Sequence, residues 1–372
     1  MIIGVPKEIK LQEHRVGLTP DSVKILHEKG HKVLVETNAG FEAGFTDQDY
    51  QRSGALIHST PSTIFKDAEI IVKVKEPQMK EVKMIRENQI IYTYLHLAAA
   101  KELTEGLIKS KSICIAYETV TDDNGRLPLL APMSAVAGRM SIQAGAHSLE
   151  KNQKGRGLLL GGAPGVEPAN IVILGGGVVG ENAAIIATGM KGKVYVVDKS
   201  KERLKQLHEM FGDKIIPTES GKTDLKKLVS ECDLLVGGVL VPGAEAPKLV
   251  TKEMIKNMKR GSVIVDVAID QGGCVETSKP TTHANPTYLV NDVVHYCVAN
   301  MPGGVPRTST MALNKATLPL LIKIADNGYK KTLIENKNYL AGLNVYKGKI
   351  TFKGVADALN FTYFPADKAL SE

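Results

Sequence analysis

The stretch that most constrains the fold is NIVILGGGVVGENAAIIATGMKGKVYVVD, residues 170–198. It joins a short apolar run, Ile171 to Leu174, directly to three glycines and then continues with small apolar residues. The pattern predicts a buried strand, a turn too tight for a Cβ atom at Gly175 to Gly177, and a helix over Val178 to Met190. Such a helix directs unpaired backbone N–H groups and the positive end of its dipole at the space over the turn. The stretch therefore predicts an anion-binding site.

The spacing of the glycines specifies the anion further. Gly175, Gly177 and Gly180 satisfy G-x-G-x-x-G, in which the first glycine makes the turn, the second lets a pyrophosphate approach the backbone and the third lets the helix pack on the strand. The next apolar run ends in Asp198, and 198 minus 180 gives 18 positions beyond the last glycine, close to the ~20 expected for a ribose-binding carboxylate. A glycine turn that only packs a helix closely is the alternative. The order of strand, turn, helix, strand and acid favours dinucleotide binding.

Composition limits the class of protein. A chain of 372 residues predicts about two domains, each long enough to bury its own core. The four cysteines show no C-x-x-C spacing and no histidine at metal-ligand spacing, so we expect no metal site and a reducing compartment, the cytoplasm. The start MIIGVPKEIK lacks the apolar region of a signal peptide, and no stretch approaches ~18 uninterrupted apolar residues. We therefore expect no membrane span.

The net charge of +7 does not indicate a nucleic-acid partner. Lysine and arginine lie among acids throughout, as in KSKERLKQLHEMFGDK, with no basic block and no interleaved aromatic residues. We interpret the charge as a solvated surface whose positive field attracts small anions such as a dinucleotide or a carboxylate.

The first 130 residues alternate between strands and helices. Thr19 is expected to cap a helix that starts at Pro20 and ends at Gly30. Strands are expected at Ile2–Val5, Lys32–Glu36, Ile70–Val74, Ile90–Leu95 and Ile113–Tyr117, and a long helix at Ser134–Glu150. This alternation predicts a parallel sheet with helices on its faces.

The rest of the chain predicts a second unit of the same kind. Its strands are expected at Ile171–Leu174, Val194–Val197, Leu234–Gly237, Val263–Val267 and Val293–Val298, followed by a loop over 300–310 and a helix over Met311–Asp326. The C-terminal stretch is expected to rejoin the first domain. The predicted fold class is α/β, with two Rossmann-like doubly wound parallel-sheet domains and a cleft between them. The domains are a discontinuous substrate domain, 1–128 plus 307–372, and a nucleotide-binding domain, 129–306.

Polar residues at the predicted strand ends are candidates for chemistry, because ligands of open parallel sheets gather outside the carboxyl ends of the strands. Lys75, His96 and Asp270 fit this position, and Arg15 lies in the loop after the first strand. Each has a structural alternative, such as a hydrogen-bonded histidine, a turn-forming aspartate or a solvated cation. Together they supply a cationic clamp for a carboxylate, an acid/base and an anion that stabilises an iminium. Hydride transfer to a nicotinamide at an amine carbon needs these parts.

Several motifs make the chain resemble the alanine dehydrogenases, within the alanine dehydrogenase and pyridine nucleotide transhydrogenase family, over essentially its whole length. They are GVPKEIKLQEHRVGLTP at 4–20, TYLHLAA at 93–99, APMSAVAGRMSIQAGAHSLEK at 131–151, VDVAIDQGGCVETS at 265–278 and HYCVANMPGGVPRTST at 295–310. The resemblance implies reversible NAD-dependent oxidative deamination of L-alanine to pyruvate and ammonium by a cytoplasmic homo-oligomer, usually a hexamer. These small molecules would be its partners, with no nucleic acid and no membrane.

The resemblance also implies roles for individual residues. Arg15 and Lys75 would bind the substrate carboxylate and carbonyl, His96 would be the acid/base and Asp270 the second essential polar group. The dinucleotide would contact Ser134, Gly175, Gly177, Val178, Gly180, Asp198, Arg203, Ser220 and Asn300. Asp198 favours NAD over NADP because a carboxylate repels a 2′-phosphate, while Lys199, Lys201 and Arg203 act in the opposite direction.

The chain departs from the usual family pattern at Leu11, Gln12 and Ala135, which leaves every catalytic candidate in place. Ala135, next to Ser134, puts the local support of the cofactor in doubt. Three alternatives remain: the soluble NAD-binding subunit of proton-translocating transhydrogenase, a saccharopine-dehydrogenase-like enzyme with a larger substrate, and non-enzymatic NAD binding. The segments LHLAA and AIDQGG argue against the first, and the complete set of polar candidates argues against the last.

Overall fold

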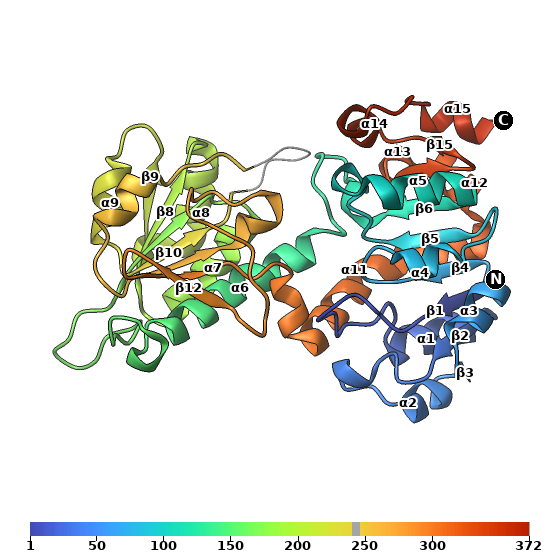
Figure 1. Ribbon diagram of the computed structural model, residues 1–372, viewed down its shortest axis with the longest axis horizontal. Coiled ribbons are helices and arrows are strands. Elements are labelled where there is room, and N and C mark those ends of the chain that lie inside the picture. The colour runs from blue at the N-terminus through green and yellow to red at the C-terminus, as the bar shows by residue number, and fades with distance from the viewer. Residues whose placement is uncertain (240–245, 372) are drawn as a thin grey trace. The chain divides into compact units, whose positions relative to one another are not determined.

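A computed structural model describes residues 1–239 and 246–371 (Figure 1). The chain forms two compact units, of which the first comprises Met1–Pro132 and Val305–Glu372 and the second Met133–Gly304. Each unit contains its own β-sheet flanked by helices. The prediction of two α/β domains dominated by parallel strands is therefore confirmed.

The sheet of the first unit has the strand order β15-β14-β6-β5-β4-β1-β2-β3. The strands are β1 (Ile2–Val5), β2 (Lys32–Glu36), β3 (Leu56–His58), β4 (Ile70–Val72), β5 (Ile90–Thr93), β6 (Ile113–Ala116), β14 (Leu343–Tyr346) and β15 (Lys349–Ile350). All neighbouring strands in the part β6-β5-β4-β1-β2-β3 pair in parallel. Strands β14 and β15 form an antiparallel hairpin beside β6. Parallel pairing places the carboxyl ends of β1, β4 and β5 at one edge of the sheet.

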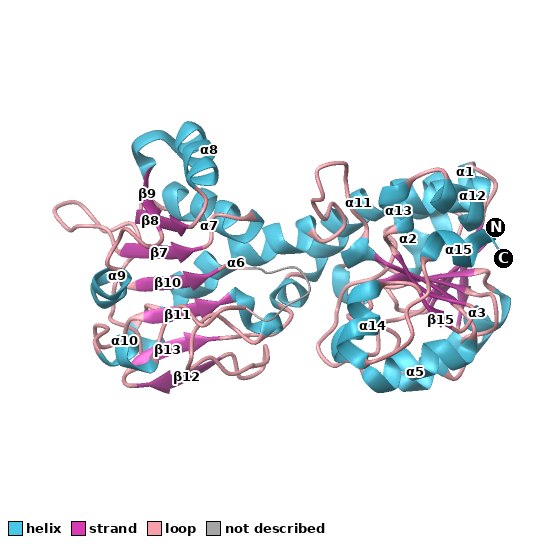
Figure 2. Cartoon of the chain, turned by 90° about the horizontal axis from the view of Figure 1, so that it is seen from above, coloured by secondary structure: helices cyan, strands magenta, loops and turns pink. Residues whose placement is uncertain are grey.

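Helices lie on both faces of this sheet, with α5 on one face and α13 on the other (Figure 2). The helices of the unit are α1 (Pro20–Glu28), α2 (Asp47–Arg52), α3 (Pro61–Asp67), α4 (Met79–Val82), α5 (Lys101–Ser110), α11 (Pro306–Asn327), α12 (Tyr329–Ile334), α13 (Lys337–Leu340), α14 (Lys353–Leu359) and α15 (Ala366–Ser371). The predicted start of α1 is confirmed, because Pro20 is its first residue and the Thr19 hydroxyl accepts a hydrogen bond from the N–H of Ser22 at 3.2 Å. The long helix α6 (Ala131–Ser148) begins in the first unit and continues into the second.

The sheet of the second unit has the order β12-β13-β11-β10-β7-β8-β9, which can be followed in Figure 2. Its strands are β7 (Asn170–Leu174), β8 (Lys193–Asp198), β9 (Ile215–Glu219), β10 (Leu234–Gly237), β11 (Val263–Asp266), β12 (Thr287–Val290) and β13 (Val293–Tyr296), and its further helices are α7 (Val178–Gly189), α8 (Lys201–Phe211), α9 (Leu225–Glu231) and α10 (Lys252–Lys256). Apart from the antiparallel edge strand β12, the pairs are parallel. When β12 is left out and the other strands are numbered along the chain, the order from β9 to β13 is 3-2-1-4-5-6, which is typical of dinucleotide-binding sheets. The strand order reverses between β7 and β10.

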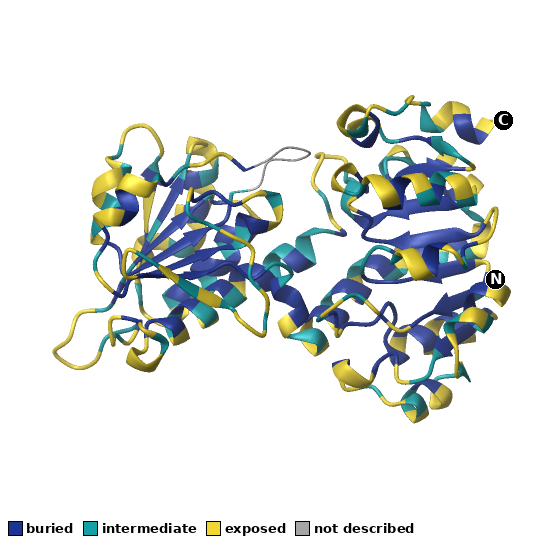
Figure 3. Ribbon diagram, in the orientation of Figure 1, coloured by how far each residue is buried: buried dark blue, intermediate teal, exposed yellow. Residues whose placement is uncertain are grey.

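Burial on both faces explains the continuous apolar strands of the second unit. Ile171 and Ile173 pack in one core cluster, and Val172 and Leu174 pack in the cluster on the opposite face. Strands that are covered on both sides read as uninterrupted apolar runs rather than as alternating ones. Figure 3 shows the central strands as buried and the outer faces of the helices as exposed.

The structure corrects several predicted boundaries. Residues 306–310 are not a loop, because α11 starts at Pro306, where proline fits the first helical position. Strand β4 ends at Val72 rather than Val74, since the Val74 N–H donates to the side chain of Glu8 at 2.7 Å. The short strands β3, β12, β14 and β15 and the proline-containing strand β9 were not predicted. Pro217 reads as a strand breaker, but β9 is an edge strand, where proline is tolerated.

Candidate active site

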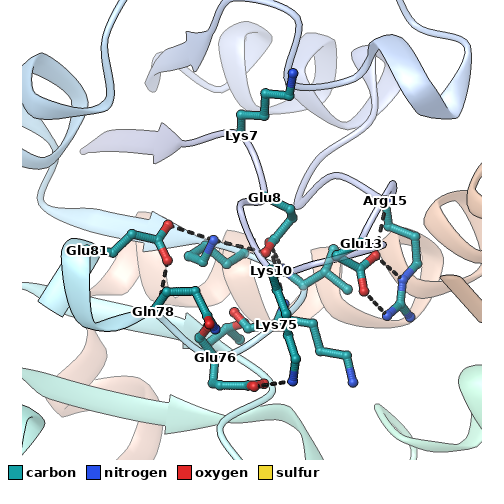
Figure 4. Close-up of polar contacts among 12 residues, drawn as sticks. Lys7, Glu8, Lys10, Glu13, Arg15, Lys75, Glu76, Gln78 and Glu81 are labelled. Carbon is teal, nitrogen blue, oxygen red and sulfur yellow. Dashed lines mark hydrogen bonds and ion pairs between the residues drawn. The ribbon is translucent and has the colours of Figure 1, made fainter. Parts of the chain in front are cut away.

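The loop after β1 carries a buried arginine that is fixed by a neighbouring acid. Arg15 is 2% exposed, and its Nε and Nη2 donate to the Glu13 carboxylate at 2.7 and 2.6 Å. Burial alone would lower the pKa of the guanidinium, but the hydrogen bond and the charge of Glu13 raise it above its ordinary value. Arg15 therefore keeps its charge in a region from which water is excluded, where a charge acts more strongly than in water. This bidentate pair can be followed in Figure 4.

A second buried ion cluster lies between this loop and β4. The side chain of Lys73 is buried, and its ammonium lies 3.0 Å from Glu8 Oε2 and 2.9 Å from Glu81 Oε1. Burial raises the pKa of the Glu8 carboxyl. Burial would lower the pKa of Lys73, but the charges of Glu8 and Glu81 raise it. A buried ammonium is therefore held charged between two acids.

The Glu8 carboxylate also fixes the backbone that carries Lys75. Glu8 Oε1 accepts hydrogen bonds from the N–H groups of Val74 and Lys75 at 2.7 and 3.4 Å. The Lys75 side chain is partly exposed, unlike that of its buried neighbour Lys73. One acid on the loop after β1 therefore positions Lys75, and another positions Arg15.

His96 follows β5 in an unusual backbone conformation. Its φ of 50° is in the left-handed region, and its N–H donates to Glu118 Oε1 at 2.6 Å. Holding a non-glycine residue there needs support from its surroundings, which the Glu118 carboxylate supplies. The ring remains accessible, since 49% of the side chain is exposed, and lies 5.8 Å from the ring of Tyr94.

An acid lies between this histidine and a lysine of the β1 loop. Glu76 Oε2 is 3.9 Å from His96 Nδ1, and Glu76 Oε1 forms a short ion pair with Lys10. Burial would raise the pKa of the Glu76 carboxyl, but its hydrogen bond and ion pair with Lys10 lower it. The first unit thus places three predicted residues, Arg15, Lys75 and His96, after strands β1, β4 and β5 at one edge of its sheet.

Sequence reasoning missed the acids around these three residues, Glu8, Glu13, Glu76 and Glu118, and Glu81 beside Lys73. All except Glu118 lie among lysines in GVPKEIKLQEHR and KVKEPQMKEVK, a pattern that reads as a solvated surface. A signal was nevertheless present, because an acid directly after a buried parallel strand lies at the ligand-binding edge of the sheet. Glu8 is three residues beyond β1, and Glu118 is two residues beyond β6.

The glycine turn of the second unit has the predicted geometry. Gly175 has φ +94°, a conformation that favours glycine, and α7 begins three residues later at Val178. A Cβ on Gly180 would lie 1.8 Å from the carbonyl oxygen of Gly175, so only glycine lets the helix pack this closely. A Cβ on Gly177 would meet no atom within 4 Å, and the Val178 side chain is 43% exposed. The N-terminus of α7 is therefore open to a ligand.

Asp198 ends β8 beside this turn. Its Oδ2 accepts a hydrogen bond from the Gly176 N–H at 2.7 Å, and its Oδ1 accepts one from the Ser200 N–H at 2.8 Å. Arg203 on α8 donates from Nε to the Gly176 carbonyl at 2.7 Å and forms an ion pair with Glu181. The side chains of Asp198 and Arg203 therefore both form hydrogen bonds with the backbone of Gly176.

The remaining predicted residues of the second unit also lie outside its strands' carboxyl ends or on α6. Ser220 follows β9, and its N–H donates to the Asp198 carbonyl at 2.9 Å. Asp270 lies exposed in the 3₁₀ turn Val267–Gln271 after β11, and Asn300 follows β13 with φ 65°. Ser134 lies on α6, one turn from its start. Asp270 lies at this edge of the sheet because β11, the strand before it, is parallel to β10 and β7.

A buried acid supports the turn that carries Asp270. Asp266, the last residue of β11, is fully buried and accepts hydrogen bonds from Ser278 Oγ at 2.6 Å and from the Val275 N–H at 3.2 Å. Lys248 Nζ donates to the carbonyl oxygens of Gly272 and Gly273. The turn is therefore held from both sides of Asp270.

Residues 1–239 and 246–371 contain no group of three or more histidine, cysteine or acidic side chains arranged to hold a metal ion. Within the same ranges, no helix combines the length and apolar character needed to cross a bilayer.

Two sheets dominated by parallel strands, one with a G-x-G-x-x-G turn where its strand order reverses, define a two-domain α/β protein whose second unit has the strand order of dinucleotide-binding folds. Domains described as "Alanine dehydrogenase/PNT, N-terminal domain" and "Alanine dehydrogenase/PNT, C-terminal domain" match residues 4–137 and 141–353. The chain belongs to the alanine dehydrogenase/PNT family.

Known proteins similar to this chain carry the same family name. It is 55% identical to an alanine dehydrogenase of Halomonas elongata, covering 98% of this chain and 99% of that one. It is 53% identical to an alanine dehydrogenase of Methanococcus maripaludis, and both chains are covered completely. A solved structure of an L-alanine dehydrogenase superposes with a TM-score of 0.94 at 51% identity, covering 97% of this chain and 99% of that one. A transhydrogenase of Sinorhizobium meliloti, with TM-score 0.82 and 23% identity over 94% of this chain and 100% of that one, shares the fold.

Proposed function

We propose that this protein is an NAD-dependent L-alanine dehydrogenase. It converts L-alanine, NAD⁺ and water into pyruvate, ammonium, NADH and a proton, reversibly. The observation that carries the proposal is the set of Arg15, Lys75 and His96 at one sheet edge, where buried acids hold Arg15 and the Lys75 backbone in place. The relatives at more than half identity that bear this name support it.

The first unit binds the substrate in this proposal. Arg15 is oriented by Glu13, and its planar guanidinium suits a carboxylate. Lys75 supplies a point charge for the carbonyl oxygen of pyruvate or the carboxylate of alanine. Because Glu8 and Glu13 hold these cations before the substrate arrives, little reorganisation accompanies binding.

His96 moves the protons of the reaction. Oxidation requires a neutral amine, and the water that attacks the resulting iminium must lose a proton. Histidine suits both transfers near neutral pH, and the accessible ring of His96 lies near the Glu76 carboxylate. Asp270 of the second unit is proposed as the second essential polar group, because a carboxylate favours an iminium.

The second unit fits a dinucleotide. The turn presents the N-terminal N–H groups of α7, a glycine at 177 where a Cβ would meet no atom within 4 Å, and a carboxylate at 198 for a ribose. NAD, when bound, supplies the acceptor for the hydride that leaves the amine carbon. Gly175, Gly177, Val178, Gly180, Asp198, Arg203, Ser134, Ser220 and Asn300 are proposed to bind it. Asp198 makes NAD the preferred cofactor over NADP.

The domain roles and the assembly complete the proposal. The substrate domain is residues 1–128 plus 307–372, and the NAD-binding domain is residues 129–306. The enzyme is proposed to be a cytoplasmic homohexamer, on the basis of the family resemblance and of the four buried cysteine thiols, which suit a reducing compartment. Light scattering of the purified protein tests the assembly.

A spectrophotometric assay of NADH formation tests the activity. The purified protein is supplied with NAD⁺ and a panel of amino acids that includes L-alanine, D-alanine, L-serine, L-lysine and saccharopine. The proposal expects the highest kcat/KM with L-alanine, and pyruvate with ammonium should consume NADH. Higher efficiency with saccharopine or lysine would indicate the larger-substrate alternative, and the absence of turnover with any amino acid would contradict the proposal.

A further inference from the structure

One peptide of the glycine turn is held from both sides by opposite charges. The N–H of Gly176 donates to Asp198 Oδ2 at 2.7 Å, and the carbonyl of Gly176 accepts from Arg203 Nε at 2.7 Å. Asp198 is the residue at which a ribose 2′-hydroxyl is expected. Arg203 therefore places a guanidinium beside the position that a 2′-phosphate would occupy in NADP.

This guanidinium is already paired with an acid. Arg203 Nη2 forms a short ion pair with Glu181 Oε2, and Arg203 Nη1 donates to Gln206 Oε1 at 3.2 Å. Glu181 lies in the first turn of α7, four residues after Gly177, so the acid comes from the helix that begins at the glycine turn. Both side chains of the pair are about one quarter exposed. A ligand at the turn can therefore compete for the guanidinium.

We infer that Glu181 is a specificity-determining residue, which keeps the charge of Arg203 from pairing with a 2′-phosphate and so strengthens the preference for NAD over NADP. The inference rests on the proposed binding of a dinucleotide by the second unit. Arginine binds phosphate bidentately and strongly, so an arginine at this position would by itself favour NADP. Pairing with Glu181 offsets that tendency, while Arg203 Nε continues to hold the Gly176 carbonyl.

Three variants separate this role from a general effect of charge. Glu181→Gln removes the acid that pairs with Arg203. Glu202→Gln, on the exposed first turn of α8, removes the same charge from the residue next to Arg203 in the chain. The double variant Glu181→Gln with Arg203→Gln removes the released cation as well. The complete purified protein is titrated with NADH and with NADPH, and nucleotide fluorescence gives both dissociation constants.

We expect Glu181→Gln to lower the ratio of the NADPH to the NADH dissociation constant about three- to tenfold, the effect of one partly exposed charge-assisted contact. The ratio should stay at its original value in Glu202→Gln, and the double variant should return to it. An unchanged ratio in Glu181→Gln, or an equal fall in either other variant, overturns the inference and leaves NADH binding as proposed. An unmodified protein that binds no NADH overturns both the inference and the proposed function.

Discussion

The two sheet edges that we propose to bind ligands are built in different ways. The first unit uses side-chain charges that are buried and paired, as in Glu13 with Arg15 and Lys73 with Glu8 and Glu81. The second unit uses backbone N–H groups at an open glycine turn, with Asp198 at its side. A small carboxylate offers few contacts, so its site needs fixed charges, whereas a dinucleotide offers many contacts along an exposed backbone.

The difference has consequences for stability. A buried ion pair contributes little net stability, but loss of one partner leaves an uncompensated charge in a medium of low dielectric. A glycine turn is limited by space rather than by charge, so a single methyl group is enough to disturb it. Substitutions in the two units should therefore fail for different physical reasons.

The largest effect is expected for His96, the proposed proton-transfer residue. Replacing His96 by alanine should lower kcat about 100- to 10,000-fold, the usual contribution of general acid/base catalysis, and Asp270→Asn in the other unit should have a comparable effect. Both variants should still bind NADH, since neither residue belongs to the glycine turn. Steady-state kinetics and NADH titration measure the two effects. A His96→Ala enzyme that keeps most of its kcat and its pH profile would show that the histidine is structural.

Removal of the buried cation should mainly affect folding. Lys73→Met leaves Glu8 and Glu81 buried without their common partner, and we expect it to reduce the free energy of unfolding by about 3–5 kcal/mol. Lys66→Met, at the exposed end of α3, is the matched control and should change stability by less than about 0.5 kcal/mol. Urea unfolding of the whole protein, followed by far-UV circular dichroism, provides the measurement. Equal stability of the two variants would mean that the cluster is hydrated or already neutral.

The glycine turn offers a pair of variants that separates packing from ligand approach. Gly180→Ala puts a methyl group against the Gly175 carbonyl and should reduce both stability, by about 1–3 kcal/mol, and NADH affinity. Gly177→Ala meets no atom within 4 Å, so it should leave stability nearly unchanged while weakening NADH binding. Thermal unfolding and NADH titration of both variants test this. If Gly177→Ala binds NADH normally, the dinucleotide does not approach the turn there.

Two carboxylates of the first unit should give pH dependences of opposite sign. Burial raises the pKa of Glu8, so its contribution to stability is complete below the ordinary carboxyl pKa and is lost as pH rises through the raised pKa. Lys10 lowers the pKa of Glu76 despite partial burial, so the contribution of Glu76 is present above the ordinary pKa and is lost as pH falls through the lowered value.

The corresponding variants should therefore differ in opposite directions from the unmodified protein. Above the ordinary carboxyl pKa, Glu8→Gln should make the slope of the free energy of unfolding against pH more positive. Below the ordinary carboxyl pKa, Glu76→Gln should make this slope more negative. Each change is limited to about 1.4 kcal/mol per pH unit. Urea midpoints measured across the acidic range, with Glu102→Gln on the exposed start of α5 as control, decide the signs. Changes of the same sign in both variants would contradict the assigned pKa directions.

The sequence predicted the elements whose signals are local. The apolar runs of β1, β2 and β10 and the proline start of α1 were located correctly because burial on both faces, or a cap, determines them. Strand β14 was missed because pairing with β6, more than 220 residues earlier in the chain, makes it a strand, and the two-residue strand β15 forms by pairing with β14. Local composition carries no trace of such a long-range contact.

The candidate site shows the same difference between residues with local sequence signals and residues that depend on long-range contacts. Arg15, Lys75, His96 and Asp198 could be chosen because they follow predicted strands or fit a glycine motif. Their supporting residues could not be chosen in this way, since Glu8 meets the backbone of Lys75 across 67 positions and Glu118 meets that of His96 across 22. Glu181 was also missed, because an acid on the first turn of a helix usually needs no explanation beyond the helix dipole.

The proposal that the first unit binds the substrate and the second unit binds the dinucleotide is tested most directly by Arg15→Ala and Lys75→Ala. The binding of the two ligands is measured separately. The dissociation constant of NADH is obtained by fluorescence titration, and the KM of pyruvate is obtained at saturating NADH and ammonium. We expect each variant to raise the pyruvate KM about 10- to 100-fold, the effect of one lost charged hydrogen bond, and to change NADH affinity less than about twofold. A large loss of NADH affinity in either variant, with pyruvate use retained, would contradict the assignment of the substrate to the first unit.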